Sequence, residues 1–181
     1  GLYSIEINKR GERSFSYWRD KSPTKYIFLG SKGKRLLNDI KNSDIFYYSG
    51  ISVGILDVNQ KEQLIKVGAT ANICGFDFNF RHQLHHDKKK SQVIFKEINN
   101  HVDINFVSYD DVKQLFNTRN PNQIFDVLNK ENNLILLRYK NLIIFKKFDQ
   151  EIKSIKVPHE EVVDTTAAGD AFNGSFLALL N

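Results

Sequence analysis

Short, continuous apolar runs alternate with amphipathic segments along most of the chain, and this alternation predicts strands separated by helices. The apolar runs predict strands at residues 45–48, 73–78, 102–106 and 134–137, followed by apolar segments at 142–148 and 152–157. The amphipathic segments predict helices at residues 31–43, 59–71, 91–100, 110–116 and 121–132. Because the strands are apolar throughout, we expect a mostly parallel sheet that helices cover on both faces.

The start of the chain follows a different pattern, because apolar and polar residues alternate there. Residues 2–7 and 14–19 are typical of two strands, and the polar segment 8–12 between them contains a glycine, which favours a turn. We therefore expect a small β excursion at residues 1–30, followed by an α/β core over residues 31–181.

The composition excludes several classes of protein. Hydrophobic residues make up 41% and charged residues 26% of the chain, which is typical of a globular domain. No run approaches the roughly 18 apolar residues that a membrane-spanning helix needs. The single cysteine, Cys74, excludes a disulfide framework and favours the reducing cytoplasm. The net charge of +5 comes mostly from scattered lysines, and the dense run at residues 88–90 is expected to start a solvated helix, so we expect neither nucleic acid nor membrane as a partner.

Both ends of the sequence are expected to be cuts through a larger fold. The sequence contains no methionine, and its first residues already belong to a predicted strand. It stops within the apolar helical pattern of residues 172–181, without a glycine or proline stop signal. We expect Leu177, Leu179 and Leu180 to be exposed there.

The strongest indication of chemistry is the small-residue turn at residues 164–169, which leads into a helix predicted to start near Gly169. Backbone N–H groups at a helix start bind phosphate, and small side chains let a phosphoryl group approach them. Asp170 follows in the first turn, where a carboxylate can accept the proton of an attacking hydroxyl. The residues also allow a structural alternative, in which Asp164 caps the helix and Asp170 interacts with its dipole.

The whole run at residues 164–172, Asp-Thr-Thr-Ala-Ala-Gly-Asp-Ala-Phe, resembles the motif DTTGAGDAF of the ribokinase-like sugar kinases, with Ala167 where glycine is common. Other segments resemble the 2-keto-3-deoxygluconate kinases within that family. Residues 1–19 resemble their lid hairpin, residues 44–52 their YLSGIS strand end, and residues 76–81 their FDxNYR segment. The resemblance covers nearly all of the chain.

The resemblance implies a ribokinase-like three-layer α/β fold with a parallel-rich central sheet and a β lid at the start, incomplete at both ends. It implies transfer of the γ-phosphoryl group of ATP to the 6-hydroxyl of 2-keto-3-deoxygluconate, with Mg²⁺ bridging the nucleotide phosphates. In this reaction Asp170 is the base, and the backbone of Ala167, Ala168 and Gly169 forms the anion hole. The lid is a candidate surface for a homo-oligomer.

A sugar acid differs from a neutral sugar in its carboxylate, which a guanidinium can bind through two parallel hydrogen bonds. Arg19 and Arg81 each follow a predicted strand, and ligands bind at strand ends in open α/β sheets. Tyr3 and Tyr17 on the two hairpin strands offer hydroxyl groups, although cross-strand aromatic packing is an alternative for them. The resemblance implies that these four residues contact the sugar acid, together with Asp170.

The resemblance also implies that Asn79, Arg81 and Arg138 bind the nucleotide, and that Asp111 has an indirect role in organising magnesium. For Asp111 the alternative is a solvated helix start. The chain departs from the family after Arg138, because a Lys-x-Gly element is common there and this sequence has no glycine. Side chains would crowd ATP unless Asn141 adopts a left-handed conformation.

Two alternative functions stay open. The first is a kinase for another sugar, such as fructose or ribose, which would leave the charge of Arg19 without a partner. The second is an inactive remnant that acts as a binding or structural subunit, which would account for the missing glycine and the expected cuts.

We predict that the 181-residue chain, purified alone, does not phosphorylate 2-keto-3-deoxygluconate. Phosphoryl transfer depends on groups that several loops position at once, and the expected cuts would remove part of both walls of the cleft. An ATP-dependent phosphorylation assay on the purified chain checks this expectation. Clear turnover would show that nothing essential lies outside these residues.

Overall fold

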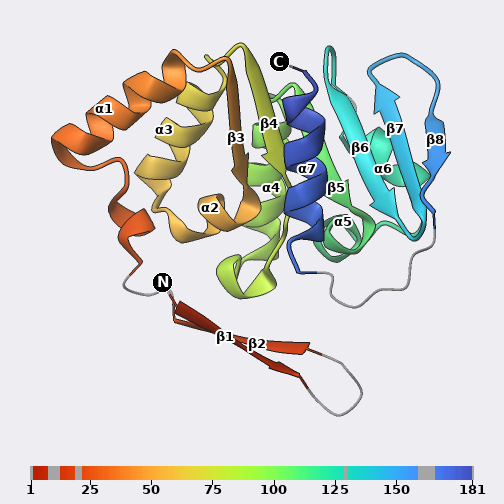
Figure 1. Cartoon of the computed structure of the whole chain (residues 1–181), viewed down its shortest axis with the longest axis horizontal. Helices are drawn as coiled ribbons and strands as arrows, with labels where there is room; N and C mark the ends of the chain where they lie inside the picture. The colour runs from red at the N-terminus through yellow and green to blue at the C-terminus, as the bar shows by residue number, and fades with distance from the viewer. Residues whose placement is uncertain (1, 8–12, 19–21, 129, 159–165, 181) are drawn as a thin grey trace.

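A six-stranded sheet forms the centre of the molecule (Figure 1). The computed structural model describes residues 2–7, 13–18, 22–128, 130–158 and 166–180. In spatial order, the strands of the sheet are β3 (Ile45–Ser49), β4 (Ile73–Asp77), β5 (Ile104–Ser108), β6 (Leu134–Tyr139), β7 (Leu142–Lys147) and β8 (Lys153–Lys156). Strands β3 to β6 run parallel, whereas β7 and β8 are added antiparallel at the edge.

Helices lie on both faces of this sheet. They are α1 (Gly30–Lys41), α2 (Gly50–Ile55), α3 (Val58–Gly68), α4 (Lys88–Asn99), α5 (Tyr109–Phe116), α6 (Asn122–Val127) and α7 (Ala168–Ala178). Ile40 of α1 and Phe95 of α4 belong to one large apolar cluster, to which α3, α5 and α6 also contribute. Of the described helices, α7 crosses the opposite face (Figure 1), where Leu177 packs with Phe106 and Leu136 in a second cluster. The three layers agree with the expected fold class.

Carboxylate caps fix the starts of two helices. Asp57 Oδ1 accepts a hydrogen bond from the backbone N–H of Gln60 at 2.8 Å, directly before α3. Asp87 Oδ1 accepts one from the backbone N–H of Lys90 at 3.0 Å, directly before α4. Such caps satisfy N–H groups that have no partner within the helix. The lysine run at residues 88–90 is therefore the exposed first turn of α4, as the sequence predicted.

The predicted strands and helices are confirmed, with differences in detail. Strand β5 begins at Ile104 and not at residue 102, and the side chain of Asp103 beside its start accepts the N–H of Cys74 at 2.8 Å. Helix α6 ends at residue 127, before the predicted end at 132. Helix α2 was not predicted, since six residues directly after a strand are too few to show a helical period.

The end of α7 corrects one expectation about exposed leucines. Leu177 is only 8% exposed, because it faces the sheet, whereas Leu179 is 86% exposed and Leu180 also faces solvent. The single cysteine, Cys74, is buried. None of the helices in the described ranges has the length and apolar character that crossing a membrane requires.

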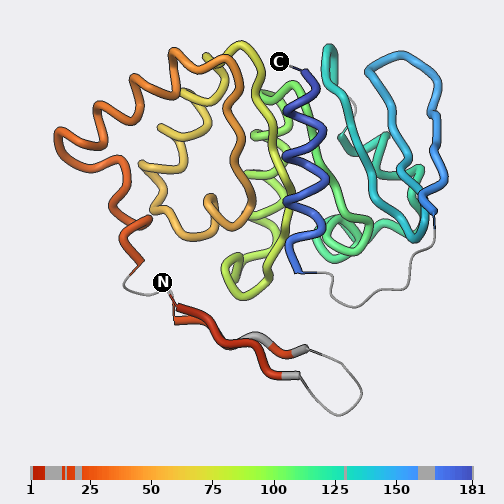
Figure 2. The backbone as a smooth tube through the Cα atoms, viewed as in Figure 1, coloured from red at the N-terminus to blue at the C-terminus, as the bar shows by residue number. Residues whose placement is uncertain are grey.

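Strands β1 (Leu2–Ile7) and β2 (Arg13–Trp18) form the predicted antiparallel hairpin, with Tyr3 opposite Tyr17. The hairpin projects from the α/β body on the side where the parallel strands end and where α7 begins (Figures 1 and 2). The side chains of Leu2, Tyr3 and Trp18 are exposed on it. The hairpin therefore stands on the side of the sheet at which ligands bind in open α/β folds.

Candidate active site

Helix α7 starts in the way that an anion site requires. Ala167 adopts a left-handed conformation with φ 60° and ψ 9°, and α7 begins at the next residue, close to the predicted start. The Ala171 N–H donates to the Ala167 carbonyl at 2.8 Å, whereas N–H groups ahead of it in the first turn have no carbonyl of their own helix to reach. Asp170 lies exposed in this turn. The start of α7 thus offers backbone donors that are not used within the helix, beside an accessible carboxylate.

One helical turn further on, α7 is tied to the sheet by a buried polar side chain. Asn173 is 1% exposed, and its Nδ2 donates to Asp77 Oδ2 at the end of β4 at 2.9 Å and to the Tyr47 hydroxyl on β3 at 3.0 Å. Arg138 at the end of β6 completes the group. Its Nη2 lies 3.5 Å from Asp77 Oδ1, and its Nη1 lies 3.5 Å from Asn173 Oδ1. We call Tyr47, Asp77, Arg138 and Asn173 the buried polar cluster.

The cluster is electrostatically coupled to the start of α7. Burial raises the pKa of Asp77, and the nearby charge of Asp170 adds to this effect, while Arg138 and the Asn173 amide oppose it. Burial and the charge of Asp77 together raise the pKa of Tyr47 to about 12, so that its hydroxyl stays protonated. The charge of Asp170, in the first turn of α7, therefore reaches Asp77 at the end of β4.

Arg138 lies directly against the predicted anion hole. A Cβ atom on Gly169 would lie 2.8 Å from Arg138 Nη1, so a side chain at this position would force the guanidinium to shift. The guanidinium carbon is also 5.8 Å from the centre of the Phe172 ring, within the range of a cation–π contact. The structure thus brings Arg138, predicted to bind the nucleotide, next to the backbone predicted to bind the phosphoryl group.

Asp111 and Arg81 belong to the same charged region. Asp111 is half-buried near the start of α5, and burial, with a smaller contribution from Asp77, raises its pKa to about 6, although Arg81 and Arg138 lower it. The alternative for Asp111 was a carboxylate solvated at the start of a helix. Its neighbour Asp110 is exposed in this way, whereas Asp111 is half-buried. Two guanidinium groups and two carboxylates therefore lie within electrostatic reach of one another.

The loop after β4 holds Asn79 at the edge of the buried polar cluster. Asn79 has φ 31°, and its backbone N–H donates to the Asp77 carboxylate, which lowers the pKa of that group. The loop is anchored by Phe78, which is fully buried. A Cβ on Gly50 would lie 2.1 Å from the Phe78 carbonyl oxygen, so a glycine is required where the loop crosses the start of α2. The two segments that resembled YLSGIS and FDxNYR are thus in direct contact.

Other predicted site residues lie apart from this group or beyond the described residues. Tyr3 and Tyr17 lie on the hairpin with ring centres 6.2 Å apart, so the cross-strand packing that the sequence allowed is present. Arg19 and Asp164 lie outside the described residues. After Arg138, the left-handed residue is Lys140, with φ 53°, and not Asn141, whose left-handed conformation would have relieved the expected crowding of ATP. The turn between β6 and β7 therefore takes, with a lysine, the conformation that glycine adopts more readily.

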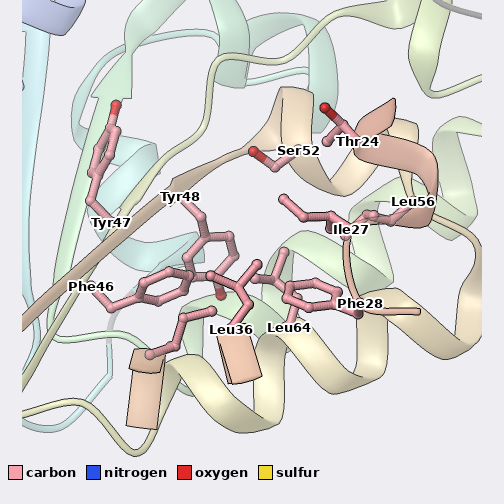
Figure 3. Close-up of a pocket in the computed structure, with 11 residues that line it drawn as sticks. Thr24, Ile27, Phe28, Leu36, Phe46, Tyr47, Tyr48, Ser52, Leu56 and Leu64 are labelled. Atoms are coloured by element: carbon pink, nitrogen blue, oxygen red, sulfur yellow. The ribbon is translucent and has the colours of Figure 1, made fainter. Parts of the chain in front are cut away.

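A cavity of about 210 Å³ between α1, α3 and β3 is a different kind of site (Figure 3). Its lining includes Phe28, Leu36, Phe46 and Leu64, and it contains no charged side chain. In Figure 3 the Tyr47 ring points away from the other lining side chains, in keeping with its contacts to the buried polar cluster. Phosphate is not stabilised by apolar walls, so this cavity does not compete with the start of α7 as an anion site.

The charged region has donors for the phosphates of a nucleotide and a carboxylate, Asp111, for magnesium. Guanidinium groups and free backbone N–H groups are the donors that phosphate oxygens accept from. In the described part of the chain, no group of three or more His, Cys, Asp or Glu residues could hold a metal ion. Magnesium commonly binds through one or two carboxylates together with substrate phosphates, and Asp111 is a carboxylate of this kind.

Comparisons with known proteins point to carbohydrate kinases. The sequence pattern of the family described as "pfkB family carbohydrate kinase" matches residues 1–181. The chain is 29% identical to the 2-dehydro-3-deoxygluconokinase of Escherichia coli K12 over 194 residues, covering 99% of this chain and 61% of that protein. It is 32% identical to the enzyme of the same name from Haemophilus influenzae, covering 98% and 59%. The chain thus spans about three fifths of the length of these relatives.

Solved structures share the fold at lower identity. An uncharacterized sugar kinase from Pyrococcus horikoshii in complex with ATP superposes with a TM-score of 0.70 at 20% identity, covering 97% of this chain and 55% of that one. A ribokinase-type protein from Escherichia coli, in complex with ATP and Mg²⁺, gives 0.75 at 18% identity, covering 98% and 57%. The fructokinase of Xylella fastidiosa with bound ATP gives 0.69 at 20% identity, covering 95% and 54%.

We predict that Ala167→Gly does not destabilise the chain, although glycine usually does. A left-handed conformation costs a residue with a Cβ roughly 1–2 kcal/mol, which offsets the greater freedom of glycine in the unfolded state. Ala171→Gly, in the right-handed part of α7, is the matched control and should lower the free energy of unfolding by about 1 kcal/mol. Urea unfolding of both variants checks this, and equal losses would contradict the special role of the Ala167 backbone.

We predict that Asp111→Asn stabilises the protein at pH 7. The pKa of Asp111 is raised in the folded state, so its charged form destabilises the fold above about pH 6, and this cost disappears as the pH falls toward 3.8. The gain in unfolding free energy should be about 1–3 kcal/mol at pH 7 and vanish near pH 4.

Unfolding at several pH values measures this effect, with the exposed Asp110→Asn as control, expected to change stability by at most about 0.5 kcal/mol. A loss of stability for Asp111→Asn at pH 7 would contradict the assignment.

Proposed function

The chain belongs to the pfkB family of carbohydrate kinases, and from this membership we propose that it carries the phosphoryl-transfer site of an ATP-dependent kinase for 2-keto-3-deoxygluconate. The reaction transfers the γ-phosphoryl group to the 6-hydroxyl of the sugar acid. The observation that supports this most is the start of α7. There, backbone N–H groups without a carbonyl partner in their own helix, the exposed Asp170 and the guanidinium of Arg138 beside Gly169 lie together at the carboxyl ends of parallel strands.

In the proposed reaction Asp170 accepts the proton of the attacking hydroxyl. The backbone of Ala167, Ala168 and Gly169 stabilises the charge that develops on the transferred group, because its donors are already oriented. Arg138 adds a positive charge at the same place, and Asn79 and Arg81 bind the nucleotide from the loop after β4. Magnesium, held by the nucleotide phosphates with indirect help from Asp111, would neutralise phosphate charge when bound.

The sugar acid is proposed as the substrate because of the arginines and the named relatives. A guanidinium binds a carboxylate through two parallel hydrogen bonds, which a lysine cannot form. This property would explain arginine at positions 19 and 81. Tyr3 and Tyr17 on the hairpin are proposed to add hydroxyl contacts. The relatives from Escherichia coli and Haemophilus influenzae carry the name of this activity, which supports the same substrate class.

A neutral sugar is the second candidate substrate, because the fold is also similar to a fructokinase with bound ATP. An inactive remnant stays the alternative from another class. The chain lacks the glycine after Arg138, and Lys140, not Asn141, adopts the left-handed conformation there, so side chains are still expected to crowd ATP.

We also propose that residues 1–30 act as a lid and as a surface for a homo-oligomer. The hairpin stands over the side of the sheet where the site lies, and Leu2, Tyr3 and Trp18 expose apolar surface that a second subunit would cover (Figure 1). The cytoplasm is the proposed location, since the single cysteine is a free, buried thiol.

We predict that Asp170→Asn, in the complete gene product that carries this sequence, lowers kcat by about 10²- to 10⁴-fold while sugar binding changes little. The amide keeps the shape of the carboxylate but cannot accept the hydroxyl proton. Steady-state kinetics and calorimetric binding measure the two effects, with Asp126→Asn on the exposed face of α6 as control. A variant that keeps more than about a tenth of the wild-type rate would remove Asp170 from the role of base.

We predict that Arg19→Lys raises KM for the sugar acid about tenfold or more and leaves KM for ATP nearly unchanged. A lysine keeps the charge but loses the second hydrogen bond to the carboxylate. The exposed Arg35→Lys on α1 is the matched control, expected to change neither constant. If KM for the sugar acid stayed the same, Arg19 would lie outside the site and the neutral sugar would become the preferred substrate.

A further inference from the structure

Two fully buried side chains hold the guanidinium of Arg138 between the sheet and the first turn of α7. Asn173 and Asp77 are 1% and 2% exposed, so they act on a substrate only through other groups. We propose that Asp77 and Asn173 are positioning residues for phosphoryl transfer, which hold the Arg138 guanidinium against the Gly169 peptide and so make its charge part of the anion hole. This inference rests on the proposed function.

The contacts form a closed ring of three planar groups. The Asn173 amide donates from Nδ2 to Asp77 Oδ2 at 2.9 Å and faces Arg138 Nη1 with its Oδ1 at 3.5 Å. The ring closes where Arg138 Nη2 lies 3.5 Å from Asp77 Oδ1. Because the amide and the carboxylate each present one oxygen to a different terminal nitrogen, they favour one orientation of the guanidinium.

The helix surface is shaped for the same guanidinium. Gly169, Phe172 and Asn173 are spaced so that they share one face of α7, and each of them contacts Arg138. Gly169 provides the space, since a Cβ there would lie 2.8 Å from Nη1. Phe172 provides a ring whose centre is 5.8 Å from the guanidinium carbon. One face of α7 is therefore matched to one arginine of β6.

The guanidinium still has donors for an incoming anion. Its side chain is 23% exposed, so it can be reached from solvent. Both contacts at 3.5 Å are longer than the roughly 2.7–2.9 Å of a strong charge-assisted hydrogen bond, and an arginine carries five N–H donors. Asp77 and Asn173 thus orient Arg138 without using up its capacity to bind phosphate oxygens.

A double-mutant cycle in the complete gene product tests the inference. Asn173→Ala and Arg138→Met should each lower kcat by about 10²-fold with little change in KM for the sugar, because a small misplacement of a catalytic charge is costly. If Asn173 acts through Arg138, the double variant should be no slower than Arg138→Met alone. Asp77→Asn, which keeps the shape of the side chain, is the second variant and should show the same dependence on Arg138.

Asn99→Ala is the matched control, because Asn99 is also buried and accepts hydrogen bonds from the amides of Asn105 and Asn133, away from the cluster. It should lower thermal stability, leave kcat within about twofold of wild type, and act independently of Arg138→Met. Losses of kcat that multiply independently for Asn173→Ala and Arg138→Met would overturn the inference and indicate a structural role for Asn173.

NMR of the Arg138 guanidinium gives a readout that needs no substrate. Rotation about its C–N bonds should be restricted in the wild type and become fast in Asn173→Ala and in Asp77→Asn. Equally fast rotation in all three proteins would overturn the inference, whichever sugar is phosphorylated. A restricted guanidinium in a wild-type protein that phosphorylates no sugar would instead support the positioning and contradict the proposed function.

Discussion

The hydrogen bond from the buried Asn173 amide to Asp77 ties helix α7 to the sheet, and the proposed chemistry depends on it. The apolar contacts of α7 with the sheet, such as that of Leu177, bring the helix to this face but leave its position along the strands less defined. A buried amide and carboxylate that bind one another allow far fewer positions, since breaking their hydrogen bond would remove one of the few contacts that offset the cost of burying them. The first turn of α7, with Asp170 and Gly169, is placed as a consequence.

The same constraint organises the charges of the site. Burial raises the pKa of Asp77 because it disfavours the charged carboxylate, and Arg138 and the amide of Asn173 lower this pKa again by stabilising the charge. Asp111 lies in the same field, with a pKa raised to about 6 by burial. Groups with shifted pKa values concentrate at functional sites, because catalytic acids and bases need a pKa that suits their reaction. The cavity between α1, α3 and β3, by contrast, has a mostly apolar lining without charged side chains, and only Tyr47 belongs both to it and to the buried polar cluster.

The sequence predicted the order of strands and helices well, because continuous apolar runs and helical periods are local properties. It also pointed to Gly169 and Asp170, since small residues before a carboxylate suggest an anion site. It did not reveal Tyr47, Asp77 and Asn173 as one cluster, because each is a single polar residue in an apolar element and its partners lie far away in sequence. Likewise, the left-handed conformation of Lys140 follows from the turn that joins β6 to β7 and not from the residue type.

The most direct measurement is a comparison of kcat/KM for phosphorylation of 2-keto-3-deoxygluconate, fructose and ribose, with ATP and Mg²⁺, by the complete gene product that carries this sequence. A site built to bind a carboxylate rejects substrates that lack it, because its guanidinium groups are then left unpaired. The proposed carboxylate-binding site predicts that kcat/KM for the sugar acid exceeds that for either neutral sugar by about 10²-fold or more. An equal or higher value for fructose or ribose, or no phosphorylation of any of the three, would contradict it.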